Sequence, residues 1–257
     1  MNNIKHEISK NGICIISLDR PPVNALSIDL LYELRKTFES INNNKDVRVT
    51  ILKSNQKHFS AGADLKEKKI MSKNDADKAL NNFNNCFNII ENHNTPVICL
   101  INGYCLGGGA ELSLSCDIRV GSNDCIVGFP EVSIGIIPGA GGTQRLPRAI
   151  GTSGAKYWIY SARKFNAQEA MEYSFLNFIT SNENLVEKGV SIANEILRNA
   201  PIAVNSAKSS IDKGFNKNII DGLKIERENY NITLNTKDRD EALDAFINKR
   251  KPKWENE

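Results

Sequence analysis

The sequence has no apolar run of about 18 residues, so it predicts no membrane-spanning helix. It contains only three histidines, His6, His58 and His93, and no Cys-x-x-Cys pair. Its six cysteines match no zinc-site spacing, and we therefore expect no metal site. Several cysteines, such as Cys99, lie within apolar stretches, which is typical of small buried thiols in a reducing compartment.

Neither sign of charge dominates the chain. Its 33 Lys and Arg residues against 30 Asp and Glu give a formal net charge of +3. This excess is too small to indicate nucleic-acid binding and suits an anionic small molecule at least as well. The N-terminal segment 1–7 is polar and has neither a secretory signal pattern nor an arginine-rich presequence. We expect a cytoplasmic protein, or a mitochondrial matrix protein whose presequence has been removed.

The first half of the 257-residue chain alternates predicted strands and helices. Apolar runs rich in β-branched residues predict strands at 12–18, 47–52 and 97–101. A helix is predicted over 28–41 behind a Ser27 cap, and a more polar helix over about 75–92. This order predicts an α/β domain with right-handed crossovers and a mixed or parallel sheet.

The second half has a different pattern, in which helix follows helix from about residue 152, with Pro201 and Gly214 between them. The predicted helices cover 153–162, 167–174, 185–199, 202–214, 219–234 and 239–248. We predict two parts in the chain: a core over 1–195 that carries the active site, and a C-terminal helical region over 196–257.

Three consecutive glycines, 107–109, stand between a predicted buried strand and an apolar helix. Such a run permits close approach of a ligand, and the free N–H groups at the helix start favour negative charge. Glu111 lies about one turn into this helix, where a carboxylate alone is usually a solvated partner of the helix dipole. A second carboxylate, Glu131, follows twenty residues later (131 − 111) on a loop behind Pro130.

Two further segments of small residues are candidates for ligand contact. Segment 59–67 is either a tight turn before a helix or a stretch of backbone that lies against a ligand. Segment 137–145 is another glycine-rich turn into a helix. It lacks both the Gly-Lys-Ser/Thr ending of a phosphate-binding loop and the full GxGxxG dinucleotide pattern, so we expect no nucleotide loop.

In this order and spacing, segments 60–66, 102–111 and 130–145 resemble the enoyl-CoA hydratase/isomerase family, also called the crotonase family. The resemblance extends to 19–26 and 245–250, and so spans nearly the whole chain. It implies a crotonase-like spiral of ββα turns, followed by a C-terminal helical region that drives trimerisation. Two such trimers commonly stack into a hexamer, so we expect a homo-oligomer.

The resemblance also implies roles for individual residues. The backbone N–H groups of Ala63 and Gly108 would form an oxyanion hole for the thioester oxygen of an acyl-CoA substrate. Glu111 would activate water, and Glu131 would supply the Cα proton. The implied coenzyme A contacts are Ala61, Ala63, Asp64, Leu65 and Lys66, with Phe246 and Lys249 from a neighbouring subunit. The resemblance implies no metal or cofactor beyond the coenzyme A of the substrate.

The presence of both glutamates favours an enoyl-CoA hydratase, which adds water reversibly and syn to a trans-2-enoyl-CoA, as in fatty-acid β-oxidation. Isomerase members typically keep only one acidic residue, and isomerisation stays an alternative. One departure from the family pattern is Phe129, where many members carry Gln. That change could reshape the acyl pocket or alter a hydrogen bond to Glu131.

Two further alternatives come from one subgroup. Segments 62–67, 145–148 and 236–239 are similar to methylglutaconyl-CoA hydratases, whose branched substrate bears a carboxylate and needs a cationic partner in the acyl pocket. RNA binding, linked with the same subgroup, is a remote alternative that rests on the basic run Lys66, Lys68 and Lys69. A solvated helix face or a contact to coenzyme A phosphates explains that run better.

Overall fold

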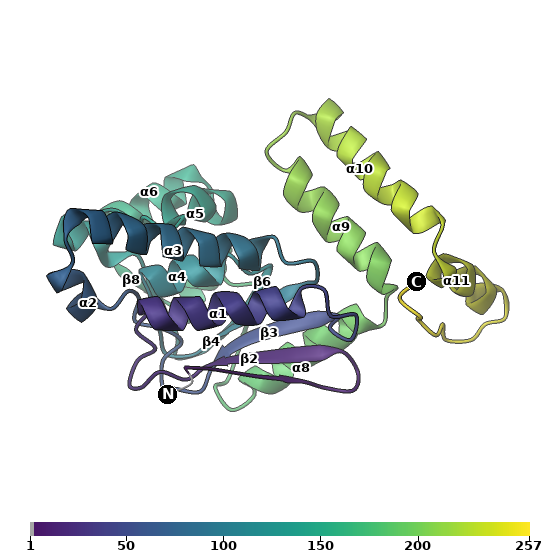
Figure 1. Cartoon of the computed structure of the whole chain (residues 1–257), viewed down its shortest axis with the longest axis horizontal. Helices are drawn as coiled ribbons and strands as arrows, with labels where there is room; N and C mark the ends of the chain where they lie inside the picture. Colours follow the sequence, from purple (N-terminus) through teal and green to yellow (C-terminus); the bar gives the residue numbers. More distant parts are fainter. Residues whose placement is uncertain (1–2) are drawn as a thin grey trace.

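The computed structural model describes residues 3–257, apart from the side chain of Lys68 (Figure 1). Its main sheet has the strand order β1-β2-β3-β4-β6-β9, and a smaller sheet has the order β5-β7-β8. The strands are β1 (Ile4–Ile8), β2 (Ile13–Leu18), β3 (Val49–Ser54), β4 (Val97–Ile101), β5 (Tyr104–Leu106), β6 (Ile118–Ser122), β7 (Ile126–Gly128), β8 (Lys164–Asn166) and β9 (Phe178–Thr180). In the main sheet only β1 pairs antiparallel, so its centre is a parallel sheet.

A parallel sheet needs cover on both faces, and β4 illustrates this with five fully buried residues. On one face, α1 (Ile28–Ile41) and α3 (Lys73–Glu91) lie over the strands; on the other lies α8 (Leu185–Leu197) (Figure 1). Successive strand residues point to opposite faces. Leu100 accordingly packs in the smaller cluster between the sheet and α8, whereas Cys99 packs in the larger cluster on the α1 side.

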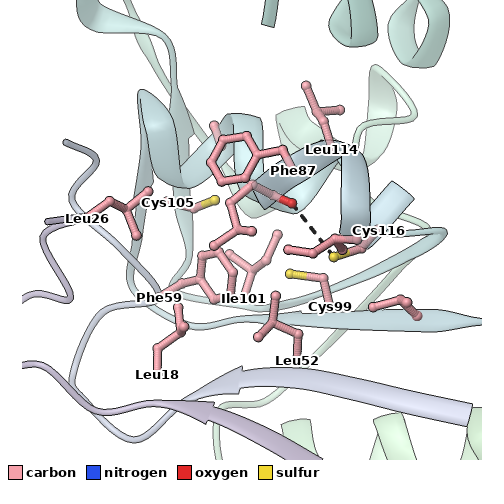
Figure 2. Packing of buried hydrophobic residues seen from close by; sticks show 14 of the residues in the cluster. Leu18, Leu26, Leu52, Phe59, Phe87, Cys99, Ile101, Cys105, Leu114 and Cys116 are labelled. Atoms are coloured by element: carbon pink, nitrogen blue, oxygen red, sulfur yellow. Dashed lines mark hydrogen bonds between the residues drawn. The ribbon is translucent and has the colours of Figure 1, made fainter. Parts of the chain in front are cut away.

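The larger cluster fills the space between the sheet and the helices above it. Figure 2 shows Leu18 and Leu52 rising from β2 and β3 towards Phe59, with Cys99 and Cys116 beside one another. All six cysteines are free and buried, which confirms the prediction of buried thiols.

The remaining helices include those that carry the glycine-rich segments and those of the C-terminal region. They are α2 (Leu65–Ile70), α4 (Gly108–Leu114), the 3₁₀ helix η1 (Pro130–Ile134), α5 (Gly142–Ile150), α6 (Thr152–Ser161), α7 (Ala167–Glu172), α9 (Pro201–Gly214), α10 (Ile219–Leu234) and α11 (Lys237–Ile247). The helices α9 and α10 pack side by side and, with α11, project away from the core (Figure 1). None of the helices within residues 3–257 is long and apolar enough to cross a membrane.

Most elements with a strong apolar period match their predictions. The helices over 28–41 and 219–234 and the strand over 97–101 have the predicted bounds, and Ser27 Oγ accepts the Leu30 N–H at 3.2 Å as the predicted cap. The prediction that the second half is purely helical is wrong, because β8 and β9 lie there. Each spans three residues, which is too short to show an alternating pattern.

Two predictions remain open after the fold is described. The predicted boundary between 195 and 196 falls inside the last turn of α8, and the division of the chain there stays a prediction. Residues 1 and 2 of the polar N-terminal segment lie outside the described residues.

His93 lies just after α3 and is almost completely buried. Its ring packs edge-to-face on Phe38, with 5.3 Å between the ring centroids. Neither ring nitrogen has a hydrogen-bond partner among residues 3–257. Burial, and then the positive charge of Lys208, lowers the pKa of His93 from 6.5 to about 4.

We predict that His93 makes the fold less stable as the pH falls. Between its unfolded and folded pKa values the unfolded chain binds a proton that the folded protein does not, so the free energy of unfolding falls from about pH 6.5 down to about pH 4. Urea unfolding at about pH 7.5 and about pH 4.5 measures the decrease in the free energy of unfolding between these pH values. This decrease should be about 2–3 kcal/mol smaller in a His93→Phe variant than in the wild type. An equal pH dependence in the two proteins would contradict this assignment.

Candidate active site

The start of α4 is where the glycine-rich centre meets the upstream small-residue segment. Gly62 has φ +93°, and a β-carbon added to it would lie 2.7 Å from Leu106 O and 3.3 Å from Gly108 N. A β-carbon on Gly108 would lie 3.5 Å from Ala63 N. Only glycine at 62 permits this approach, which brings the backbone N–H groups of Ala63 and Gly108 next to each other.

Strand-like pairing sets the direction of the Ala63 N–H. Leu26 N donates to Gly62 O at 2.8 Å, and Asp64 N donates to Leu26 O at 3.2 Å, which makes a parallel bridge between Leu26 and Ala63. In such a bridge the flanking residues 62 and 64 face Leu26, so the N–H of Ala63 itself points to the other side. Within residues 3–257, no protein acceptor takes the N–H of Ala63 or of Gly108.

Asn24 fixes the segment that leads to Ala63. It is fully buried with φ 48°, a left-handed conformation that asparagine tolerates better than most residues. Its Nδ2 donates to His58 O at 3.2 Å and to Phe59 O at 3.0 Å, and its carbonyl accepts from Ser60 Oγ at 2.7 Å. Ser60 Oγ in turn accepts the Gly62 N–H at 3.1 Å. The sequence analysis included Asn24 in the resemblance but missed this role.

Glu111 projects from the first turn of α4 and is only 3% exposed. Its Oε1 accepts two backbone N–H bonds, from Ala140 and from Gly142, each at 2.8 Å. Both donors belong to the glycine-rich segment 137–145, since Ala140 precedes α5 and Gly142 is its first residue. The structure therefore unites Glu111 with a segment that the sequence marked only as a candidate for ligand contact.

Glu131 lies at the same helix start. It stands in the first turn of η1, behind Pro130. Gly107, the N-cap of α4 with φ 51°, contacts it closely, because a β-carbon on Gly107 would lie 2.9 Å from Glu131 Oε1. The side chain of Phe129 is fully buried in the larger core cluster. This burial means that the departure at 129 serves the core packing.

The predicted coenzyme A contacts divide into two groups. Ala61, Leu65 and Lys66 are exposed and follow one another into α2, next to the Ala63 N–H. Phe246, 84% exposed, and Lys249 lie on and just after α11, at the opposite end of the molecule from α2 (Figure 1). A single chain therefore does not bring the second group to the first.

Asp64 is engaged by the protein itself. Its Oδ2 accepts from Arg20 Nη2 at 2.8 Å, and its Oδ1 accepts the N–H of Lys66 at 3.0 Å and of Glu67 at 3.4 Å. Partial burial opposes ionisation, but these bonds outweigh it and lower the pKa of Asp64 below its ordinary value. This carboxylate stabilises the start of α2 and ties it to the 20–26 loop.

The described residues contain no group of three or more His, Cys, Asp or Glu side chains that could hold a metal ion. What the site does offer is a pair of neighbouring backbone N–H groups, with two carboxylates at the same helix start. That combination suits chemistry in which negative charge develops on a carbonyl oxygen while protons move.

The chain belongs to the enoyl-CoA hydratase/isomerase family, whose model matches residues 8–257. It is 38% identical to the short-chain-enoyl-CoA hydratase of Clostridium acetobutylicum, covering 98% of this chain and 97% of that one. It is 39% identical to the mitochondrial methylglutaconyl-CoA hydratase of Mus musculus, covering 99% of this chain and 83% of that one. The crystal structure of an enoyl-CoA hydratase from Bacillus anthracis is 42% identical, with a TM-score of 0.97 over 99% of this chain and 100% of that one.

These likenesses confirm the predicted family and the predicted fold class, an α/β fold of the crotonase type with C-terminal helices. They extend over both the core and the helices α9 to α11, since the structural match covers nearly the whole chain.

Proposed function

We propose that this protein is an enoyl-CoA hydratase that adds water reversibly and syn to a trans-2-enoyl-CoA. The observation that carries the proposal is the convergence of four groups at one helix start. The N–H groups of Ala63 and Gly108 lie next to each other, Glu111 is one turn into α4, and Glu131 touches its N-cap. Two relatives whose names are hydratases support the same reaction.

In the proposed reaction the thioester oxygen accepts hydrogen bonds from Ala63 and Gly108. As water attacks Cβ, the π electrons of the double bond move towards this oxygen, and the two donors stabilise the charge. Each such donor is typically worth ~10²–10³-fold in rate. The positive end of the α4 dipole adds to the same effect.

The two carboxyl groups move the protons. Glu111 accepts a proton from the attacking water, and Glu131 donates a proton to Cα on the same face of the substrate, which makes the addition syn. Proton exchange between the carboxyl groups and solvent then restores the starting state, so no metal or further cofactor takes part. General acid–base steps of this kind contribute typically ~10²–10⁴-fold each.

We propose an unbranched short-chain enoyl-CoA as the substrate class. The named relatives act on both this class and methylglutaconyl-CoA. The branched substrate carries a carboxylate and would need a cationic partner in the acyl pocket. Arg145 contacts the loop that holds Glu111, but its guanidinium already pairs with Glu91 at 2.6 Å. Comparing kcat/KM over a panel of enoyl-CoA thioesters tests this choice: the methylglutaconyl thioester should be the poorer substrate.

The alternatives of isomerisation and RNA binding have weaker support. The site contains two carboxylates, whereas isomerase members typically keep one. Of the basic run, Lys66 and Lys69 are exposed on α2, and the side chain of Lys68 lies outside the described residues. Exposed lysines on one short helix suit the phosphates of coenzyme A, and we propose that role for Lys66.

We further propose that the active unit is a homotrimer, or a hexamer of two such trimers, in which α11 of one subunit reaches the site of the next. Phe246 and Lys249 would then contact coenzyme A bound at segment 61–66 of a neighbour. Large exposed apolar side chains in the region from α9 to α11 support this proposal; they are Ile211, Phe215, Ile219, Ile220, Leu223, Tyr230, Ile232, Leu234, Leu243, Phe246 and Ile247. Such a density of exposed apolar surface marks an interface more often than a free face. The compartment of the protein stays a prediction.

We predict that Glu111→Gln and Glu131→Gln each lower kcat by ~10²–10⁴-fold with little change in KM. The amide keeps the shape of the side chain but cannot exchange a proton as a carboxyl does. Steady-state hydration of a trans-2-enoyl-CoA, followed by loss of its conjugated absorbance, measures the effect. An exposed control outside α9 to α11, Glu187→Gln on α8, should behave as the wild type. A loss below about tenfold in either active-site variant would remove that residue from the acid–base pair.

We predict a solution mass of three or six times the 28.6 kDa chain at micromolar concentration. Light scattering coupled to size exclusion measures this mass directly. A Phe246→Asp change should weaken assembly, because it places a charge on the most exposed of the large apolar side chains of α11. A wild-type mass equal to one chain would overturn the proposed assembly.

A further inference from the structure

Arg145 and Glu91 form an ion pair beside the loop that holds Glu111. Arg145 lies in the first turn of α5, and Glu91 is the last residue of α3. The pair is bidentate: Nε donates to Oε1 at 3.1 Å, and Nη2 donates to Oε2 at 2.6 Å. Nη2 also donates to Asn88 Oδ1 at 2.7 Å. The Arg145 side chain is 11% exposed and that of Glu91 is 44% exposed, so the guanidinium is largely buried while the carboxylate reaches solvent. The two parallel bonds fix the orientation of the guanidinium.

The same guanidinium also contacts the backbone of the loop 138–142. Arg145 Nη1 donates to Ala140 O at 3.1 Å, and a β-carbon on Gly141 would overlap that nitrogen. The Arg145 N–H donates to Gly141 O at 2.7 Å. The N–H of Ala140 and of Gly142 point the other way, to Glu111 Oε1. The peptide groups of this loop are therefore bonded to Arg145 on one side and to Glu111 on the other.

The loop is also held by Ala140, which is buried in the larger core cluster, and by the Gln144 N–H, which donates to Gly141 O at 2.9 Å. Three of its five residues, 138–142, are glycines, whose backbone has more conformational freedom than that of any other residue. Asn84 Nδ2 donates to Gly139 O at a longer 3.3 Å. A planar guanidinium that bonds to a carbonyl and a carboxylate at once is suited to hold such a backbone in one conformation.

We propose that Arg145 and Glu91 are positioning residues for Glu111: the ion pair holds the loop whose two N–H groups orient the Glu111 carboxylate. This inference rests on the proposed function, in which Glu111 must be ionised and aimed at the attacking water. Arg145 and Glu91 act through the loop and do not touch the substrate.

The test compares Arg145→Ala with Arg148→Ala. Arg148 is nearly one turn further along α5, and its guanidinium donates to Asn216 Oδ1 and Gln144 O, away from the loop. Arg145→Ala should lower kcat by about 10–100-fold with a smaller change in KM, because displacement of a catalytic group by about 1 Å can cost ~10²-fold. Arg148→Ala should hydrate the substrate at nearly the wild-type rate.

The pH profile separates positioning from a general loss of structure. Two N–H bonds favour the ionised form of a carboxylate, so their loss makes protonation easier. The acid limb of the kcat/KM profile should therefore move to higher pH in Arg145→Ala and not in Arg148→Ala. Guanidinium ion, added far below unfolding concentrations, should restore part of the activity of Arg145→Ala only.

If Arg145→Ala does not fold, Glu91→Gln tests the positioning role instead. The amide keeps the shape of the Glu91 side chain and removes the charge that orients the guanidinium. This variant should show a smaller loss of kcat and the same direction of shift in the acid limb. An unchanged acid limb in the folded Arg145 or Glu91 variant would overturn the proposal. Glu111→Gln in the same assay separates the two levels. If Glu111→Gln is fully active, the proposed role of Glu111 is wrong. If Glu111→Gln is inactive but Arg145→Ala behaves as the wild type, only the positioning role of Arg145 is wrong.

Discussion

The proposed chemistry depends on two backbone N–H groups that lie side by side and, within the part of the chain that the structure describes, donate to no protein acceptor. Ala63 supplies one because its parallel bridge to Leu26 turns its own N–H away from that strand. Gly108 supplies the other because it is the first residue of α4. Neither donor is fixed by a partner of its own, so other contacts must hold both in place. The buried bonds of Asn24 supply that restraint on the Ala63 side.

Backbone groups also control the carboxylates. Glu111 is oriented by two N–H groups at the start of α5, and Glu131 is held against the N-cap of α4 by the short helix η1. In the proposed reaction these glutamates have opposite tasks, since one accepts a proton and the other donates one. The different anchoring of the two side chains gives each carboxyl group its own environment, as a division between acid and base requires.

The sequence predicts those features that repeat at short range. The apolar period over 28–41 and the buried run over 97–101 are local, and both elements have the predicted bounds. The identities of Glu111 and Glu131 as candidates came from their place near glycines and from the resemblance. Contacts between distant residues have no such pattern: Arg145 and Glu91 are 54 positions apart, and the bonds of Asn24 reach 34 and 35 positions along the chain. The three-residue strands β8 and β9 are likewise fixed by their neighbours in the sheets and not by their own sequence.

The polarisation of the substrate carbonyl by the two N–H groups is most directly tested by infrared spectroscopy of a bound thioester. A saturated acyl-CoA with a ¹³C-labelled thioester carbonyl cannot be hydrated and reports only on the hydrogen bonds to its oxygen. On the wild-type protein its carbonyl stretch should lie at lower wavenumber than in water, and a folded Gly108→Pro variant, which lacks one donor, should reverse part of that shift. A bound carbonyl with the same frequency as in water, or an equal shift in the proline variant, would contradict the account.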